Sequence, residues 1–113
     1  MAAYTLAVDD CLRLLARVDT GEIESEMFYV NGAPEWFVVF DRARIEVIEI
    51  AGKAPGVALE RDSGRVLVRR GYASSRRLVI AAAEYLTYYW ITDAGRTAAA
   101  QLLTMHSGEQ EKP

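Results

Sequence analysis

The chain has 113 residues, 51% of them hydrophobic, and carries a formal net charge of −3 at pH 7. This length and apolar content fit one domain with its own core, and no apolar run reaches the ~18–20 residues that a bilayer span needs. The N-terminal residues lack the basic and then apolar order of a signal peptide, and the single cysteine, Cys11, excludes an internal disulfide. We therefore expect a cytoplasmic protein without a membrane partner, and the Ala- and Arg-rich composition favours a bacterial or phage source.

An amphipathic helix is predicted over residues 4–18. Its apolar positions recur at the 3.6-residue spacing that places them on one stripe. These positions are Ala7, Cys11, Leu14, Leu15 and Val18. Asp9 and Arg13 fall on the opposite side, and Gly21 is predicted to end the helix.

Three strands are predicted next, over Met27–Val30, Trp36–Phe40 and Ile45–Ile50. All three are rich in β-branched and aromatic residues. The segment 31–34 separates the first two strands, and because Pro34 cannot donate to a ladder we expect a loop of about four residues there. A second turn is expected at 41–44 and a third at 51–56.

A β-hairpin is predicted over Val57–Arg70, with Ser63 and Gly64 as its two-residue turn. In this register Leu59 lies opposite Val68. One face is then apolar (Val57, Leu59, Val66 and Val68) and the other is charged (Glu60, Asp62, Arg65 and Arg69). The alternation of the two faces supports the register.

A helix is predicted from about Arg76 to Ile91, capped by Ser74 or Ser75. It is apolar nearly all round, so we expect it to be buried by its own sheet or by a second copy of the chain in a homodimer. Thr92 is predicted to cap a final helix over Asp93–Met105. The expected fold is α+β, with an N-terminal helix, an antiparallel meander of about five strands and two C-terminal helices. It occupies residues 1–106 as a single domain, and residues 107–113 form a flexible tail.

The arginines provide the main functional signal. Residues 1–60 carry 11 acidic and 5 basic side chains, a balance of −6, whereas residues 61–113 carry 5 acidic and 8 basic ones, a balance of +3. A local basic surface on an acidic chain indicates contact with something anionic. The candidate partner-binding residues are Arg65, Arg69, Arg70, Arg76 and Arg77, since a guanidinium suits both phosphates and carboxylates. The alternative is that these arginines cover a sheet and pair with Glu60 and Asp62.

Two further groups are candidate contact surfaces. Glu22, Glu24 and Glu26 alternate, so in an extended segment they line one face as a possible second, acidic surface, or as a solvated edge that resists aggregation. The densest aromatic group consists of Tyr85, Tyr88, Tyr89 and Trp90. It is expected to pack in the core or, as the second choice, to form the dimer contact.

Nothing in the chain indicates catalysis. His106 is the only histidine and lies in the predicted tail. No glycine-rich loop matches a phosphate cradle, and no Cys or His spacing fits zinc. We therefore expect no catalytic residue, no metal and no cofactor, and a protein that is not an enzyme.

The segment Trp90–Ala100 resembles the end of bacterial winged-helix DNA-binding domains. It contains Thr92, Asp93, Ala94, Gly95 and Arg96, and in those domains a wing strand runs into such a turn at the start of the last helix. The resemblance implies a wing, for which the predicted hairpin over 58–68 is the candidate, and a DNA-binding function. Winged-helix domains place helices ahead of the wing, whereas this region is predicted as strands. In size, charge and lack of a catalytic motif, the chain is also similar to small phage anti-CRISPR proteins.

The leading hypothesis is a non-enzymatic protein that binds a protein or nucleoprotein partner. It would be an inhibitor or accessory factor of a nucleic-acid machine, comparable to an anti-CRISPR protein. The alternative is a winged-helix-like transcriptional regulator that binds DNA directly. The two hypotheses predict different salt responses, because direct DNA binding weakens steeply as salt rises, while a mixed protein interface responds mainly through its association rate.

Overall fold

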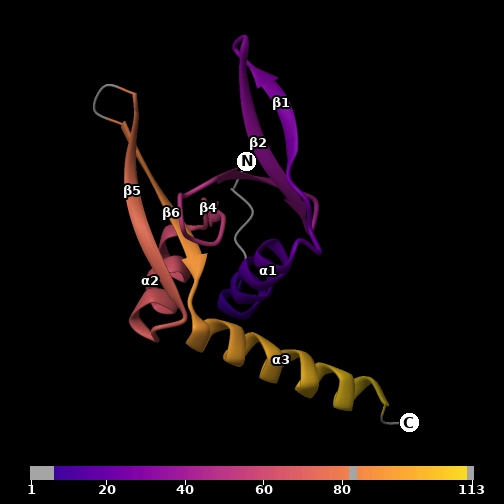
Figure 1. Ribbon diagram of the computed structural model, residues 1–113. Helices are drawn as coiled ribbons and strands as arrows, with labels where there is room; N and C mark the ends of the chain where they lie inside the picture. The colour runs from indigo at the N-terminus through magenta and orange to yellow at the C-terminus, as the bar shows by residue number, and fades with distance from the viewer. Residues whose placement is uncertain (1–6, 82–83, 112–113) are drawn as a thin grey trace.

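The computed structural model describes residues 7–81 and 84–111, with the backbone alone described at 80–81 and 103–111. Three helices and six strands follow one another along the chain (Figure 1). They are α1 (Val8–Thr20), β1 (Glu26–Val30), β2 (Ala33–Phe40), β3 (Ala43–Ile48), β4 (Gly56–Val57), α2 (Arg61–Arg69), β5 (Ala73–Ala81), β6 (Glu84–Ile91) and α3 (Asp93–Glu111). The strands form one antiparallel sheet in the order β1-β2-β3-β4-β6-β5. The predicted α+β class is confirmed.

Helix α1 confirms the first predicted helix and supplies much of the core. Its buried side chains are Cys11, Leu12, Leu14, Leu15 and Val18. Gly21 ends the helix in the left-handed conformation (φ 78°), and its N–H donates to the carbonyl of Val18. Residues 4–6 of the predicted helix lie outside the described residues.

The meander β1–β2–β3 confirms the three predicted strands but shortens their turns. Asn31 and Gly32 both have positive φ and form a two-residue loop, the arrangement that the Asn-Gly pair favours. Pro34 therefore belongs to β2 rather than to the loop, which corrects the predicted loop of four residues. The strand tolerates it because pairing of β2 with β3 begins only at Trp36, so the missing N–H breaks no ladder.

The predicted hairpin over Val57–Arg70 is wrong, because most of this segment forms helix α2. Glu60 caps the helix, and its carboxylate accepts a hydrogen bond from the N–H of Ser63 at 3.1 Å. Gly64, predicted to make a turn, instead faces the ring of Tyr89. A Cβ there would lie 2.3 Å from the Cζ of Tyr89, so the helix can approach the sheet only with glycine at this position.

The predicted helix over residues 76–91 is also wrong, since this stretch forms the antiparallel hairpin β5–β6. Neighbouring residues of β6 point to opposite faces, and both faces are covered in its second half, where Tyr88 and Tyr89 are both buried. A strand covered on both faces reads as a continuous apolar run, which also resembles a fully buried helix. The expected self-association depends on an apolar helix in this segment, and the structure has strands there instead.

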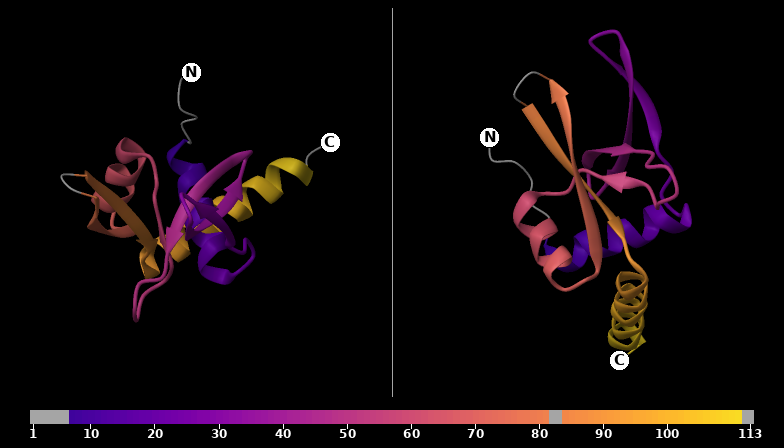
Figure 2. Two further views of the ribbon diagram at one scale, coloured as in Figure 1. Left: turned by 90° about the horizontal axis from the view of Figure 1, so that it is seen from above. Right: turned by 60° about the vertical axis from the view of Figure 1, so that its left-hand side comes forward.

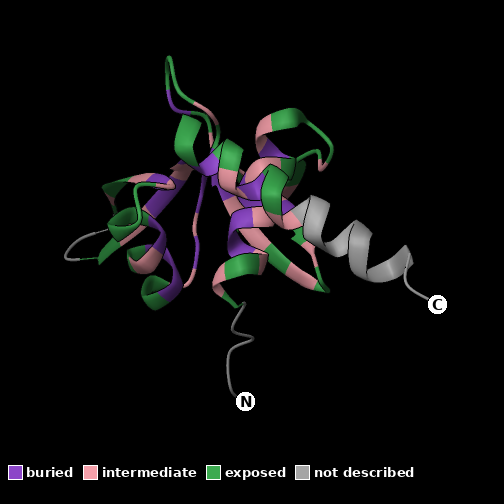
Figure 3. Cartoon of the chain, turned by 90° about the horizontal axis from the view of Figure 1, so that it is seen from below, coloured by how far each residue is buried: buried purple, intermediate pink, exposed green. Residues whose placement is uncertain are grey.

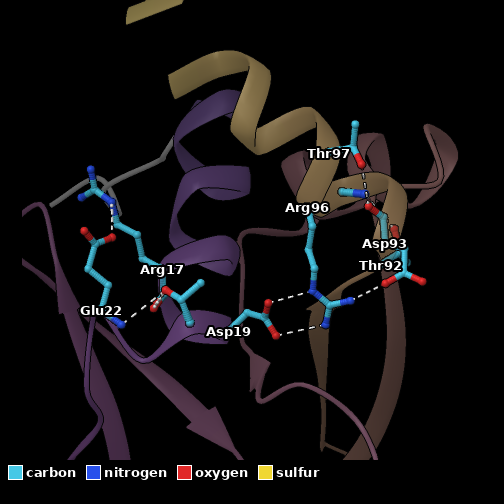
Figure 4. Close-up of polar contacts among 9 residues, drawn as sticks. Arg17, Asp19, Glu22, Thr92, Asp93, Arg96 and Thr97 are labelled. Carbon is cyan, nitrogen blue, oxygen red and sulfur yellow. Dashed lines mark hydrogen bonds and ion pairs between the residues drawn. The ribbon is translucent and has the colours of Figure 1, made fainter. Parts of the chain in front are cut away.

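Helix α3 confirms the final predicted helix and extends it to Glu111, so the backbone of most of the predicted tail is helical. Thr92 caps it as predicted, since its Oγ1 accepts from the N–H of Gly95 at 3.1 Å. The same Oγ1 donates to the carbonyl of Gly71 at 2.6 Å, which ties the cap to the turn after α2. Arg96 completes this junction by binding both Asp19 of α1 and Asp93 (Figure 4).

The core lies between the helices and one face of the sheet. Side chains of α1 pack there with Val38, Val47, Val57 and Tyr89 from the strands and with Leu67 from α2. Figure 3 shows that buried positions gather around α1 and the strands beside it, while much of the periphery is exposed. The two hairpins, β1–β2 and β5–β6, project from this centre (Figure 1). Within the described chain, no helix is long and apolar enough to cross a membrane.

Candidate macromolecule-binding surface

Helix α2 has one buried side and one exposed side. Ser63, Gly64 and Leu67 are buried on its inner side. Arg61, Arg65 and Arg69 are exposed, and their spacing of four residues places them along the outer side of the helix. At 1.5 Å per residue, the row from Arg61 to Arg69 covers about 12 Å of helix axis.

Hairpin β5–β6 lies beside α2 (Figure 2) and carries Arg76 and Arg77 on β5. Arg77 pairs with Thr87 and therefore shares the sheet face of Tyr89, against which α2 packs. Arg76 pairs with Tyr88 and points to the opposite face. The structure thus brings Arg77 together with the arginines of α2, but it does not form the single strip that the sequence suggested.

Arg70, the last of the predicted arginines, is the C-cap residue of α2. Its backbone N–H donates to the carbonyl of Val66, while its side chain is exposed. The predicted set is therefore distributed over the outer side of α2, its C-terminal end and both faces of β5. We call Arg61, Arg65, Arg69, Arg70 and Arg77 the arginine surface; Arg76 lies on the opposite face of β5 and is not part of it.

A pocket of about 350 Å³ lies where α2 meets the hairpin. It is lined by Leu59, Arg61, Arg77, Tyr85, Leu86, Thr87 and Tyr89. The guanidinium of Arg77 lies over the ring of Tyr85, 5.6 Å from its centroid. Burial raises the pKa of Tyr89, and the positive charges of Arg65 and Arg61 oppose that rise. The pocket therefore combines aromatic walls with cationic groups from two different elements.

The arginine surface has no acidic partners among the described side chains. The ion pairs among the described residues lie elsewhere and join Arg13 to Asp10, Arg17 to Glu22, and Arg96 to Asp19 and Asp93. The alternative pairing with Glu60 and Asp62 does not form. Backbone N–H groups of Ser63 and Asp62 lower the pKa of Glu60, because its carboxylate is the cap of α2. The charges of the arginine surface are thus available to an external anion.

The acidic residues lie at the other edge of the sheet. Glu26 begins β1, which is the first strand in the sheet order, whereas β5 is the last. Glu22 and Glu24 precede β1, and all three carboxylates are exposed. Glu22 is paired with Arg17 at 3.3 Å (Figure 4). The chain therefore presents opposite charges at opposite edges of one sheet.

The four aromatic residues do not form one cluster. Tyr88 and Tyr89 are almost fully buried on opposite faces of β6. The hydroxyl of Tyr88 donates to the carboxylate of Glu46, and burial raises the pKa of Tyr88 well above its usual range. Trp90 is half-buried, and Tyr85 is 59% exposed. Of the four, Tyr85 is the side chain best placed to meet a partner.

Arg61 and Thr87 are pocket residues that the sequence reasoning left out. The signal for Arg61 was present, because Arg61, Arg65 and Arg69 are four residues apart, but it becomes visible only when the segment is taken as a helix. Thr87 carries no such signal, since its position depends on the pairing of β5 with β6.

Cys11, the single cysteine, is buried in the core on α1. Burial raises the pKa of the Cys11 thiol to about 11, so the thiol is protonated at neutral pH. His106 belongs to the part of α3 whose side chains lie outside the described residues. In the described part of the chain, no three His, Cys, Asp or Glu residues are grouped closely enough to hold a metal ion.

A scan against protein-family models found no match, and searches of curated proteins and of solved structures found none either.

Proposed function

We propose that the protein is a non-enzymatic nucleic-acid-binding protein, which acts in the cytoplasm and meets its partner through the arginine surface. The observation that carries the proposal is the row of Arg61, Arg65 and Arg69 on the outer side of α2, beside a hairpin that supplies Arg77 on the same face of the sheet. No ion pair with a described carboxylate occupies these side chains.

The shape of this surface favours a duplex over an acidic protein face. The major groove of B-DNA is about 12 Å wide and admits an α-helix or a two-stranded ribbon. Helix α2 is exposed along its outer side, and the β5–β6 ribbon projects from the body (Figure 1). A duplex carries one charge per about 1.7 Å of axis with both strands counted, so a length of about 12 Å carries roughly seven phosphate charges, more than the three arginines of the row.

The order of elements supports direct DNA binding. The candidate wing at 58–68 is not a hairpin, but the β5–β6 hairpin runs directly into Thr92 and the start of α3. A hairpin that leads into the last helix is what the winged-helix resemblance implies, whereas the strands β1–β4 between α1 and α2 depart from it. In this proposal α2 lies toward the groove and β5–β6 takes the place of the wing.

Salt dependence and one substitution test the proposal. We expect the protein to bind a 20-base-pair duplex with a logarithmic salt slope of about −4.5 if five arginines each neutralise one phosphate. Arg65→Ala should make the slope shallower by about 1. Lys53→Ala is the matched control, since it removes one exposed positive charge from the loop before β4 and should leave the slope unchanged. Fluorescence anisotropy between 50 and 300 mM salt measures all three.

Two results would overturn the proposal. One is binding that does not respond to salt, and the other is an equal effect of Arg65→Ala and Lys53→Ala. If the duplex did not bind but an acidic protein did, the arginine surface would belong to the inhibitor or accessory factor that the sequence also suggested.

A further inference from the structure

The β1–β2 hairpin carries exposed apolar side chains far from the arginine surface. Met27, Tyr29 and Trp36 are 41%, 73% and 50% exposed. Met27 pairs with Trp36 across the two strands, and Tyr29 lies two residues further along β1, so all three share one face. Val38 is on the same face and is fully buried in the core with α1. The apolar face of the sheet thus continues beyond the part that α1 covers.

On the opposite face of the hairpin, Phe28 and Phe37 are half-buried. Phe28 and Phe37 pack edge to face with their centroids 5.8 Å apart. The guanidinium of Arg44 lies 4.0 Å from the centroid of Phe28. Within the described residues, the chain therefore covers one aromatic pair with its own side chains and leaves the face of Met27, Tyr29 and Trp36 open. Trp, Tyr and Met are enriched at the cores of protein interfaces, and Trp and Tyr dominate their binding energy.

A second pocket adjoins this face. Its volume is about 440 Å³, and its lining residues are Ser25, Trp36, Val47, Ile48, Glu49, Lys53 and Pro55. Trp36 forms part of its wall, so the exposed apolar face leads directly into a cavity. A cavity of this kind accepts an anchoring side chain of a partner.

The backbone of β1 offers hydrogen bonds along the same line. β1 is the outermost strand, and a two-residue loop makes Val30 and Ala33 a hydrogen-bonded pair. Hydrogen-bonded pairs alternate along the ladder, so the N–H and C=O groups of Met27 and Tyr29 point outward from the sheet. The residues with exposed apolar side chains are thus the ones with an unpaired backbone edge.

Charge identifies the kind of segment that fits this edge. Glu26 faces the side opposite to Met27, and Glu24 lies two residues before it. Neither is in an ion pair among the described residues. An added strand would therefore meet apolar side chains on one face and carboxylates near the other.

We propose that the edge of β1 binds an extended segment of a partner protein, in which apolar residues alternate with Lys or Arg. The segment adds a seventh strand to the sheet, its apolar side chains pack on Met27, Tyr29 and Trp36, and its cations face Glu24 and Glu26. Acidic residues also protect sheet edges from aggregation. Protection alone does not account for the exposed aromatic face, because an exposed tryptophan and tyrosine at a sheet edge favour association rather than prevent it.

A synthetic ten-residue peptide of alternating Lys and Ile tests the proposal by titration calorimetry. We expect it to bind roughly tenfold or more tightly than a Lys/Ile peptide of the same composition in block order, and than a Glu/Ile peptide. Trp36→Ala should weaken binding at least about tenfold. Val39→Ala is the matched control, because Val39 is exposed on the other face of β2 and should leave the affinity unchanged.

Methylation of alternate backbone amides of the peptide keeps its side chains and removes its edge hydrogen bonds, without any change to the protein. We expect this peptide to lose binding. Equal binding of the alternating and block peptides, or full binding of the methylated one, would overturn the proposal. So would concentration-dependent dimers that Trp36→Ala abolishes and the peptide does not displace, because the face would then bind a second copy. Arg65→Ala should not affect peptide binding, so this test is independent of the one with DNA.

Discussion

Replacing Leu67 by aspartate is expected to lower the free energy of unfolding by about 3–5 kcal/mol, whereas Val68→Asp should cost less than about 1 kcal/mol. Leu67 is fully buried in the core, while Val68 is 38% exposed on the helix. An unpaired carboxylate at Leu67 has no partner and no water, which is why the two neighbours differ so strongly. A domain of this size has about 5–15 kcal/mol of stability, so the loss at Leu67 is a large share of the total.

Urea unfolding followed by circular dichroism measures both variants. The comparison decides between the helix and the hairpin that the alternation of the sequence suggests, because in the hairpin Val68 faces inward and Leu67 outward. A larger loss in Val68→Asp than in Leu67→Asp would contradict helix α2 and, with it, the arginine row on its outer side.

Gly95→Ala is expected to destabilise the protein by about 2–4 kcal/mol. A Cβ at this position would lie 2.1 Å from the carbonyl oxygen of Tyr72 and 2.8 Å from Cγ1 of Ile91. The carbonyl belongs to the backbone and also accepts the N–H of Thr92 at 3.1 Å, so it cannot rotate away as a side chain would. The start of α3 and the turn after α2 must then move apart.

The sign of this change is the informative quantity. Helix propensity alone would make alanine more stable than glycine by about 1 kcal/mol. Thr97→Ala, at an exposed position of the same helix, serves as the control and should change stability by no more than about 0.5 kcal/mol. Thermal unfolding of the two variants suffices, and a stabilised Gly95→Ala would show that the turn at Tyr72 does not pack on α3.

The segment 57–70 shows why local pattern predicted only part of the fold. Its apolar residues fit both a period of two and a period of 3.6, and Ser63-Gly64 is a common turn sequence. The choice depends on Tyr89, which lies 25 positions after Gly64 and needs the space that glycine leaves. No window on the local sequence contains that contact. By contrast, α1 and the strands of the meander carry one consistent period, and the sequence predicts them apart from the lengths of the turns.

The helix predicted over residues 76–91 is wrong for a related reason. An apolar run without a clear period fits a buried helix or strands covered on both faces, although its β-branched and aromatic content was a signal for strands. Both wrong assignments affect the predicted grouping of the candidate site residues. The arginine-rich character of the region follows from the sequence, but the grouping of Arg77 with α2 and the separation of Arg76 depend on secondary structure that was assigned incorrectly.

Strand β4 consists of Gly56 and Val57, and through it the meander and the β5–β6 hairpin belong to one sheet. One residue pair, Val57 with Tyr89, joins it to β6. A sheet resists bending through its rows of hydrogen bonds, so a connection this narrow is a flexure between two stiffer arms. The side chains that share the core with Val57 and Tyr89, among them Leu14 and Leu15 of α1, therefore help to hold the two arms in place. Packing of α1 against both parts of the sheet thus contributes to their relative position.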